Sequence, residues 1–284
     1  MKVLFISDFS LKHTIGGAQR SNDIVCKKGL DLGYEITMLH IDVPHEEILN
    51  KKYDIVISSN MEAFSTHKKE VLEYCCDVDN HYRLEHDMCR YLENDVREKL
   101  FGNCVKTFFL TEYHINKFVE NYGNIFKNVV IVPDPIKKNT FYDYNNNRSE
   151  EILYSGFMHP LKGTNNFVKY TQEHPTSNFV VAGWGAKEYV DFFNNSNNVN
   201  YLGAVDHESM PKIFNSFKSM YYNPVIDEPF CRSVGEAIMC GMNIIGGSDK
   251  IGCLNMYNKI GKDEFITHCD RADASFWGEI SYER

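Results

Sequence analysis

Short apolar runs alternate with amphipathic segments along the first part of the chain. Residues 3–6 are apolar and stop at two polar residues, and Gly16 and Gly17 precede an amphipathic stretch over residues 18–32. This order predicts a strand, a glycine loop and a helix. Gly33 is placed to end that helix, since glycine is the usual residue just beyond a helix C-terminus.

The same alternation continues to residue 132 and predicts further strands and helices. The strands are expected at residues 34–40, 54–58, 81–85, 107–110 and 129–132, and the helices at residues 88–100 and 111–122. Strands separated by helices are typical of right-handed crossovers and of a parallel sheet that is covered on both faces. The first half is therefore predicted to be Rossmann-like.

A polar segment that contains two prolines separates this series from a second one. Pro133 and Pro135 break the pattern, and the residues up to Glu150 have little to bury. The strands of the second series are expected at residues 152–154, 179–182, 199–202, 220–222 and 243–245. Helical stretches separate these strands too.

The patterns divide the chain into four predicted parts. They are a Rossmann-like domain at 1–135, a linker at 136–150, a second Rossmann-like domain at 151–270 and a C-terminal helix at 271–284. The predicted fold class is α/β, with two doubly wound parallel-sheet domains facing across a cleft. Because ligands of such sheets bind at the carboxyl ends of the strands, we expect the site in that cleft.

Amino-acid composition and net charge exclude several classes of protein. The 284 residues are enough for two domains, and a hydrophobic content of 43% excludes wholesale disorder. A formal net charge of −9 argues against nucleic acid as a partner. The nine cysteines include no C-x-x-C motif, and no run of about 18 apolar residues is present. We therefore predict a cytoplasmic protein with no integral membrane segment.

Two loops carry candidate binding groups. Gly16 and Gly17 either let backbone amides approach an anionic or hydroxyl-rich ligand or form only a flexible turn. Lys162 follows the first strand of the second domain. A lysine and a phosphate about 4 Å apart attract by roughly 4 kcal/mol at an effective dielectric near 20. Lys162 could thus stabilise a leaving diphosphate, and the alternative is a solvated surface lysine.

The segment 227–241 has the most informative pattern. Pro229 disfavours helix at Glu228, which places Glu228 on a loop and Glu236 in the first turns of the following helix. Both carboxylates can then face one ligand. The backbone amides of residues 230–233 form a positive helix end that suits a diphosphate.

The spacing around Glu236 is also compatible with a purely structural role for this residue. Ser233 and Glu236 have the spacing of a capping box, and Arg232 and Glu236 form an i,i+4 pair. Cys231 has no base assigned to it by spacing and is expected to be a packed thiol. The run His268-Cys269-Asp270 is too isolated to predict a metal site.

The second half resembles the nucleotide-sugar domain of retaining GT-B glycosyltransferases, the family 4 group. Four elements follow the order of that family: the strand and glycine at 152–156 with Lys162-Gly163, the strand and glycine turn at 180–185, the segment 200–203, and two glutamates separated by seven residues at 228–236. The first half resembles the acceptor domain through its first strand, the Gly16-Gly17 loop and residues 130–134.

The resemblance implies a role for each matching residue. Lys162 would hold the donor diphosphate, Glu228 the transferred sugar and Glu236 the ribose, and His86 would lie near the reaction centre unless it is a packed or capping histidine. The implied catalytic residues are His86, Glu228 and Lys162, and the implied acceptor-binding residues are His86 and Asp87. The implied donor-binding residues are Gly16, Gly17, Lys162, Gly183, Trp184, Leu202, Phe230, Cys231, Arg232, Ser233 and Glu236.

Two positions depart from the pattern of the family. Phe157 stands where the family commonly has an arginine, and Arg232 is a candidate to replace that charge. Cys231 stands where the family commonly has a glycine. These departures bear on donor choice and efficiency more than on the fold.

The predicted function is that of a retaining glycosyltransferase. It would move a sugar, such as a hexose, from a UDP-sugar or a GDP-sugar to a hydroxyl group of a glycan, a lipid-linked glycan or a protein glycan. No metal and no cofactor are expected, because Lys162 and the helix start at residues 230–233 would stabilise the departing diphosphate. In this family the leaving phosphate itself can take the acceptor proton, so that no general base is assigned. The alternatives are a non-catalytic module that binds a nucleotide or glycan, and a nucleotide-sugar epimerase.

Overall fold

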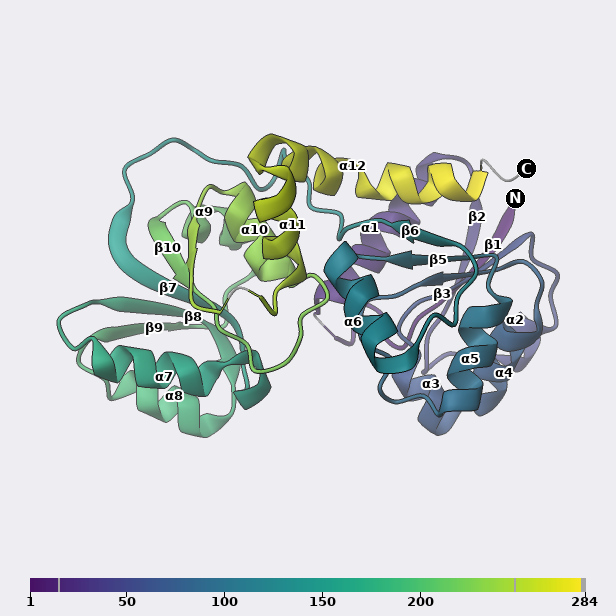
Figure 1. Ribbon diagram of the computed structural model, residues 1–284, viewed down its shortest axis with the longest axis horizontal. Coiled ribbons are helices and arrows are strands. Elements are labelled where there is room, and N and C mark those ends of the chain that lie inside the picture. The colour runs from purple at the N-terminus through teal and green to yellow at the C-terminus, as the bar shows by residue number, and fades with distance from the viewer. Residues whose placement is uncertain (15, 248, 282–284) are drawn as a thin grey trace. The chain divides into compact units, whose positions relative to one another are not determined.

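The computed structural model describes residues 1–14, 16–247 and 249–281. It divides the chain into two compact units, one of residues 1–135 and 268–284 and the other of residues 136–267 (Figure 1). Ile15 of the predicted glycine loop and residues 282–284 of the predicted C-terminal helix lie outside the described residues.

The first unit contains one parallel sheet. Its strands run in the order β2-β1-β3-β4-β5-β6, and every neighbouring pair is parallel. The strands are β1 (Lys2–Ile6), β2 (Glu35–Leu39), β3 (Ile55–Ser58), β4 (His81–Leu84), β5 (Lys106–Phe109) and β6 (Val129–Ile131). The helices are α1 (Gly17–Asp31), α2 (Glu46–Leu49), α3 (Glu62–His67), α4 (Lys69–Asp77), α5 (Asn94–Asn103) and α6 (Glu112–Tyr122).

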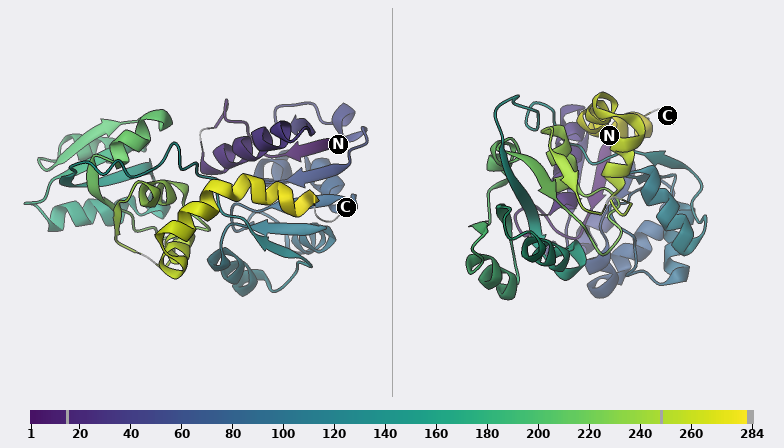
Figure 2. Two further views of the ribbon diagram at one scale, coloured as in Figure 1. Left: turned by 90° about the horizontal axis from the view of Figure 1, so that it is seen from above. Right: turned by 60° about the vertical axis from the view of Figure 1, so that its left-hand side comes forward.

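Alternate residues of these strands fill two separate cores. Val3 and Phe5 of β1 pack in a cluster with side chains of α1 and of the last helix, α12 (Lys262–Ser281), whereas Leu4 and Ile6 pack with side chains of α3 to α6. This is the two-fold alternation of a strand buried on both faces. Figure 2 shows α1 in purple and the end of α12 in yellow lying along the strands on one face of the sheet.

The second unit contains a second parallel sheet, with the order β11-β10-β7-β8-β9. Its strands are β7 (Ser149–Met158), β8 (Phe179–Gly185), β9 (Val199–Gly203), β10 (Phe217–Tyr221) and β11 (Asn243–Ile245). Its helices are α7 (Thr164–Glu173), α8 (Lys187–Asn194), α9 (Met210–Phe214), α10 (Arg232–Met239) and α11 (Gly252–Ile260), and two short 3-10 turns are η1 (Pro160–Lys162) and η2 (His207–Ser209). Aromatic side chains of α7 and α8 form the core on one face of this sheet.

Three segments differ from the sequence-based expectation. The predicted helix at 88–100 is wrong in its first part, because helix α5 begins only at Asn94. Residues 89–92 form a turn instead, in which Cys89 has a φ of 46° and the Arg97 guanidinium donates to the carbonyl groups of Cys89 and Leu92. Strand β7 begins at Ser149, inside the predicted linker, and α12 begins at Lys262, before the predicted Arg271.

Among the described helices, none combines the length and the apolar character needed to cross a bilayer.

Candidate functional site

A lysine and a glutamate meet where β7 and β10 end in the second unit. Lys162 closes η1, and its Nζ lies 2.6 Å from Oε1 of Glu228. The backbone of Glu228 is fastened to the segment before α11, because its N–H donates to Lys250 and its carbonyl accepts from Gly252. The Tyr222 hydroxyl donates to the same Glu228 oxygen at 2.9 Å. The lysine and the carboxylate that were predicted from separate motifs therefore lie in one cluster.

The Glu228 carboxylate affects the protonation of its neighbours Lys162 and Cys231. Burial alone would lower the pKa of Lys162, but the Glu228 carboxylate outweighs it, so that the pKa of Lys162 is raised. Burial and the same carboxylate raise the pKa of the neighbouring Cys231 thiol to about 12. Lys162 is thus a cation and Cys231 a protonated thiol at neutral pH, as expected for packing rather than nucleophilic chemistry.

Gly163 is required next to Lys162. It has a φ of 81°, and a Cβ at this position would clash with the backbone carbonyl of Asn223. A left-handed glycine therefore lets η1 turn into α7 directly beside the end of β10. This close approach explains the Lys-Gly pair in physical terms.

The second glutamate lies near the start of α10. Glu236 is 4% exposed, and its Oε1 accepts from Nε of Arg232 at 2.8 Å and from Nε2 of His207 at 2.9 Å. The i,i+4 pair is therefore confirmed. The capping box is wrong, because Cys231 is the N-cap residue and Ser233 already lies within the helix.

His207 and Tyr222 were not predicted as site residues. Each bonds to one of the two glutamates. His207 does so from η2, and Tyr222 does so from its place just after β10, six residues before Glu228. No local spacing in the sequence connects either residue to its glutamate. Only the packing of the strand ends brings them together.

The remaining predicted donor residues are divided between the two units, with four in the second unit and two in the first. Phe230 is buried before α10. Gly183 and Trp184 lie at the end of β8, and Leu202 lies near the end of β9. Trp184 is 55% exposed and Leu202 is 44% exposed, which is unusual for side chains of this size. Gly16 and Gly17 belong to the first unit, where Gly16 is the N-cap residue of α1.

His86 of the first unit follows β4, and each of its two ring nitrogens lies close to a side-chain oxygen. Its Nε2 lies 3.0 Å from Oδ1 of Asn22, and its Nδ1 lies 3.5 Å from Oδ1 of Asp134. Ser21 donates to the same Asp134 oxygen at 2.6 Å. The ring is therefore oriented by α1 and by the segment after β6, with its side chain only 4% exposed.

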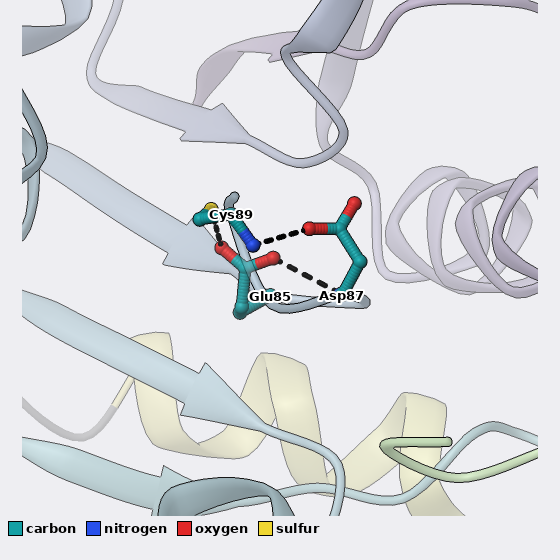
Figure 3. Close-up of side chains that lie close together, drawn as sticks. All are labelled: Glu85, Asp87 and Cys89. Carbon is teal, nitrogen blue, oxygen red and sulfur yellow. Dashed lines mark hydrogen bonds between the residues drawn. The ribbon is translucent and has the colours of Figure 1, made fainter. Parts of the chain in front are cut away.

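Asp87 lies in the turn that follows His86 (Figure 3). Its Oδ1 accepts from the Cys89 backbone N–H at 2.7 Å, and its backbone N–H donates to Glu85. Burial and the nearby Glu85 carboxylate raise the pKa of Asp87 to about 7. This carboxyl group is thus poised to change charge near neutral pH.

The side chains of Glu85, Asp87 and Cys89 lie close enough to hold an ion, but they already satisfy one another. Glu85 is paired with Arg83 at 2.7 Å, both side chains being fully buried, and the Cys89 thiol donates to Glu85 at 2.9 Å. Burial raises the pKa of Cys89 well above its ordinary value, so the thiolate that a metal needs is disfavoured. We assign no metal to this cluster.

Comparison with known proteins gives a family match and a set of similar folds. The family model of glycosyl transferases group 1 matches residues 137–276. No curated protein sequence matches the chain.

Three solved structures illustrate the similarity in fold. Sucrose-phosphate synthase from Thermosynechococcus elongatus has a TM-score of 0.69 at 13% identity, covering 99% of this chain and 91% of that chain. A glycosyltransferase from Rickettsia africae has a TM-score of 0.66 at 14% identity, covering 97% and 88%. HepE of Anabaena in complex with UDP and glucose has a TM-score of 0.65 at 13% identity, covering 96% and 94%.

Proposed function

We propose that this glycosyltransferase of the GT-B fold moves a sugar from a nucleoside diphosphate sugar to a hydroxyl group of an acceptor. The family match and the two parallel-sheet domains confirm the predicted enzyme class and the predicted fold. One observation carries the proposal of the donor. Lys162 and Glu228 meet at the carboxyl ends of β7 and β10, the edge at which parallel sheets bind ligands.

The donor diphosphate would bind to Lys162 and to the backbone amides at the start of α10. Negative charge develops on the diphosphate as the sugar leaves, and both groups offer positive charge there. Before the donor arrives, Lys162 is paired with Glu228 at 2.6 Å. The diphosphate would draw the ammonium group away, which frees a Glu228 oxygen to accept hydrogen bonds from sugar hydroxyls. Tyr222 keeps that carboxylate in place meanwhile.

Glu236 would accept the hydroxyl groups of the ribose. Arg232 and His207 both donate to its Oε1 and fix the carboxylate, which leaves Oε2 as the acceptor for the ligand. Because Arg232 is bound to Glu236, we propose that it orients this carboxylate and does not substitute for the arginine that the family commonly has at position 157.

The acceptor would approach His86 and Asp87 of the first unit. The leaving phosphate would take the proton of the acceptor hydroxyl, so that no separate base is assigned. Retention of the anomeric configuration is proposed from the family resemblance. Lys162 and the helix start supply the positive charge, and the proposal therefore uses no metal and no cofactor. A glycan, a lipid-linked glycan or a protein glycan would each present a suitable hydroxyl group.

Calorimetric titration with UDP, GDP, ADP and dTDP in buffer with EDTA tests the donor site. UDP is the first choice, because the Anabaena structure holds UDP. We expect one nucleotide to bind, and we expect Lys162→Ala to weaken it about tenfold or more. Lys187→Ala removes an exposed lysine of the same unit and should bind like the wild type.

Glu236→Gln should weaken the nucleotide as well, because it removes the anionic contact to the ribose. Incubation of the matching sugar nucleotide with glycan acceptors then tests transfer. A donor that is bound but never consumed would indicate a binding module, and a donor that is converted without an acceptor would indicate an epimerase. The absence of any nucleotide binding would refute the proposed donor site.

A further inference from the structure

Two exposed tyrosines lie together in the segment that leads into β7. Tyr142 and Tyr144 are 49% and 40% exposed, and their ring centroids are 4.8 Å apart with an interplanar angle of 54°. Single exposed apolar side chains are common on protein surfaces, whereas two large rings in contact form a small apolar surface of their own. We call these two residues the tyrosine pair.

The tyrosine pair lies at the opposite edge of the second sheet from the proposed donor site. Its segment precedes β7 and is bound to Asn215, which precedes β10, and to Cys240, which precedes β11. These three strands are parallel, and Lys162 and Glu228 lie beyond their other ends. Strand β7 has 10 residues and therefore spans about 30 Å. A ligand of the tyrosine pair would thus be separate from the donor.

Hydrogen bonds hold the backbone of the tyrosine pair in place. The side chain of Asn215 is buried, accepts from the N–H of Tyr144 at 2.8 Å and donates to the carbonyl of Tyr142 at 2.9 Å. Between the two rings, Asp143 turns to Arg148, whose guanidinium donates to it at 2.6 Å. The side chains therefore alternate between inward and outward, and a backbone that is already ordered lowers the entropy lost on binding.

Uncharged polar groups follow the rings directly. Asn145, Asn146 and Asn147 are exposed, and their side-chain amides have no hydrogen-bond partner among the residues that the structure describes. Asn145 has a φ of 53°, and its N–H donates to Asp143 at 2.9 Å, so that the chain turns immediately after Tyr144. Each amide offers two donors and one acceptor. Apolar rings and unused amides are thus neighbours on one short segment.

From this arrangement we infer that the tyrosine pair and the three asparagines form a second ligand site, which binds a neutral oligosaccharide. A sugar ring has a face of C–H groups that suits the negative face of an aromatic ring, and its hydroxyl groups suit amides.

The charged side chains beside this site favour a neutral ligand. Asp143 is paired with Arg148. Glu150, two residues further on, is paired with Lys218. These pairs leave little charge for an ionic ligand or for an anionic membrane surface, which attracts clusters of basic residues. The inferred site goes beyond the proposed transfer reaction and does not depend on it.

Saturation-transfer difference NMR of the full chain tests this inference. The probes are four neutral oligosaccharides: maltohexaose, cellohexaose, mannohexaose and chitohexaose. We expect at least one of them to bind with a Kd on the order of 1 mM, a weak affinity that suits a small surface site. Saturating UDP should leave this binding unchanged, because the tyrosine pair lies at the other edge of the sheet from Lys162.

Removal of either ring should weaken the oligosaccharide. Tyr142→Ala and Tyr144→Ala are each expected to weaken it about fivefold or more, whereas Tyr142→Phe keeps the ring and should stay within about twofold of the wild type. Phe157→Ala is the matched control. It removes an aromatic side chain that is 41% exposed at the carboxyl end of β7, and it should bind the oligosaccharide like the wild type.

The amides are tested by the double variant Asn146→Ala with Asn147→Ala. It should weaken the oligosaccharide about threefold or more, because it removes hydrogen-bonding groups beside the rings. Asn145 is left in place, since its left-handed backbone favours asparagine.

The outcomes separate this inference from the proposed function. The inference is overturned if none of the four probes binds, if both tyrosine-to-alanine variants bind like the wild type, or if UDP displaces the probe. Binding to phosphatidylserine vesicles, or self-association in sedimentation, that is lost in Tyr142→Ala while no oligosaccharide binds would assign the rings to a membrane or to a second copy, and would overturn it too. If no nucleotide binds but an oligosaccharide binds through the tyrosines, the proposed donor site fails and this inference stands.

Discussion

At the scale of single residues, Cys231 occupies a backbone conformation that suits glycine. Its φ is 72° and its ψ is 81°, at the N-cap position of α10. A side chain in the left-handed region costs an L-residue about 1–2 kcal/mol. We expect Cys231→Gly to be more stable than Cys231→Ala by about 1 kcal/mol, because alanine keeps the Cβ and glycine does not. Denaturant unfolding of the two variants measures this difference, and a less stable glycine variant would contradict it.

Asp87 gives a prediction about pH. Burial and Glu85 raise its pKa to about 7 in the folded state, above the ordinary value of 3.8 that it keeps when unfolded. The folded chain therefore holds a proton between those values that the unfolded chain has lost, and the stability that this proton supplies is lost as the pH rises toward 7. Asp87→Asn mimics the protonated form. It should lie within about 1 kcal/mol of the wild type near pH 4 and exceed its free energy of unfolding by about 4 kcal/mol at pH 8, because the shift from 3.8 to about 7 corresponds to about 1.4 kcal/mol for each pKa unit.

Urea unfolding at both pH values measures the effect of Asp87→Asn. Asparagine keeps an oxygen for the Cys89 N–H, so the turn should remain intact. Asp79→Asn replaces an exposed aspartate of the same unit and serves as the control. A stability difference that stays constant between pH 4 and pH 8 would show that the charge of Asp87 is not the cause.

At the scale of secondary structure elements, the last helix is part of the core of the first unit. Trp277 of α12 is fully buried, stacks on Tyr34 with centroids 4.6 Å apart, and donates from Nε1 to the carbonyl of Val25. A Cβ at Gly29 would clash with the Trp277 ring, so α1 leaves room for it. Trp277→Ala should therefore cost about 3–5 kcal/mol of unfolding free energy.

Thermal unfolding followed by circular dichroism measures the cost of Trp277→Ala. Trp184→Ala truncates the exposed tryptophan and serves as the control, with an expected loss below about 1 kcal/mol. Equal losses for the two variants would mean that α12 contributes little to the stability of the first unit.

Short apolar runs separated by amphipathic segments predicted most of the strands and helices. A strand such as β1 buries both of its faces, and its sequence is therefore a short apolar run. The helix predicted at 88–100 was wrong in its first part, because contacts between a side chain and the backbone decide where the helix begins. Arg97 binds the carbonyl groups of a preceding turn, and no local periodicity encodes that turn. In the site, Lys162 and Glu228 were found by motif. Tyr222 reaches Glu228 through the shape of the loop between them, and His207 reaches Glu236 through tertiary packing, and neither contact follows from a motif.

At the scale of the whole molecule, each of the two units contains one tryptophan. Trp277 lies in the first unit and Trp184 in the second. Lys162 and the start of α10, which are proposed to hold the diphosphate, also belong to the second unit. A ligand stabilises the cooperative unit that binds it, by about 2.7 kcal/mol at a concentration one hundred times its Kd. The nucleotide should therefore stabilise the second unit selectively.

The variant Trp184→Phe leaves Trp277 as a reporter of the first unit, and circular dichroism follows both units together. In urea, saturating nucleotide should leave the Trp277 transition in place and move the remaining part of the circular dichroism transition to higher urea. If the Trp277 transition moves by the same amount, the two units unfold as one, since a ligand of one unit can stabilise the other only through shared cooperativity. Because α12 has residues in both units, Trp277→Ala, which removes a buried side chain of this helix, should then weaken the coupling.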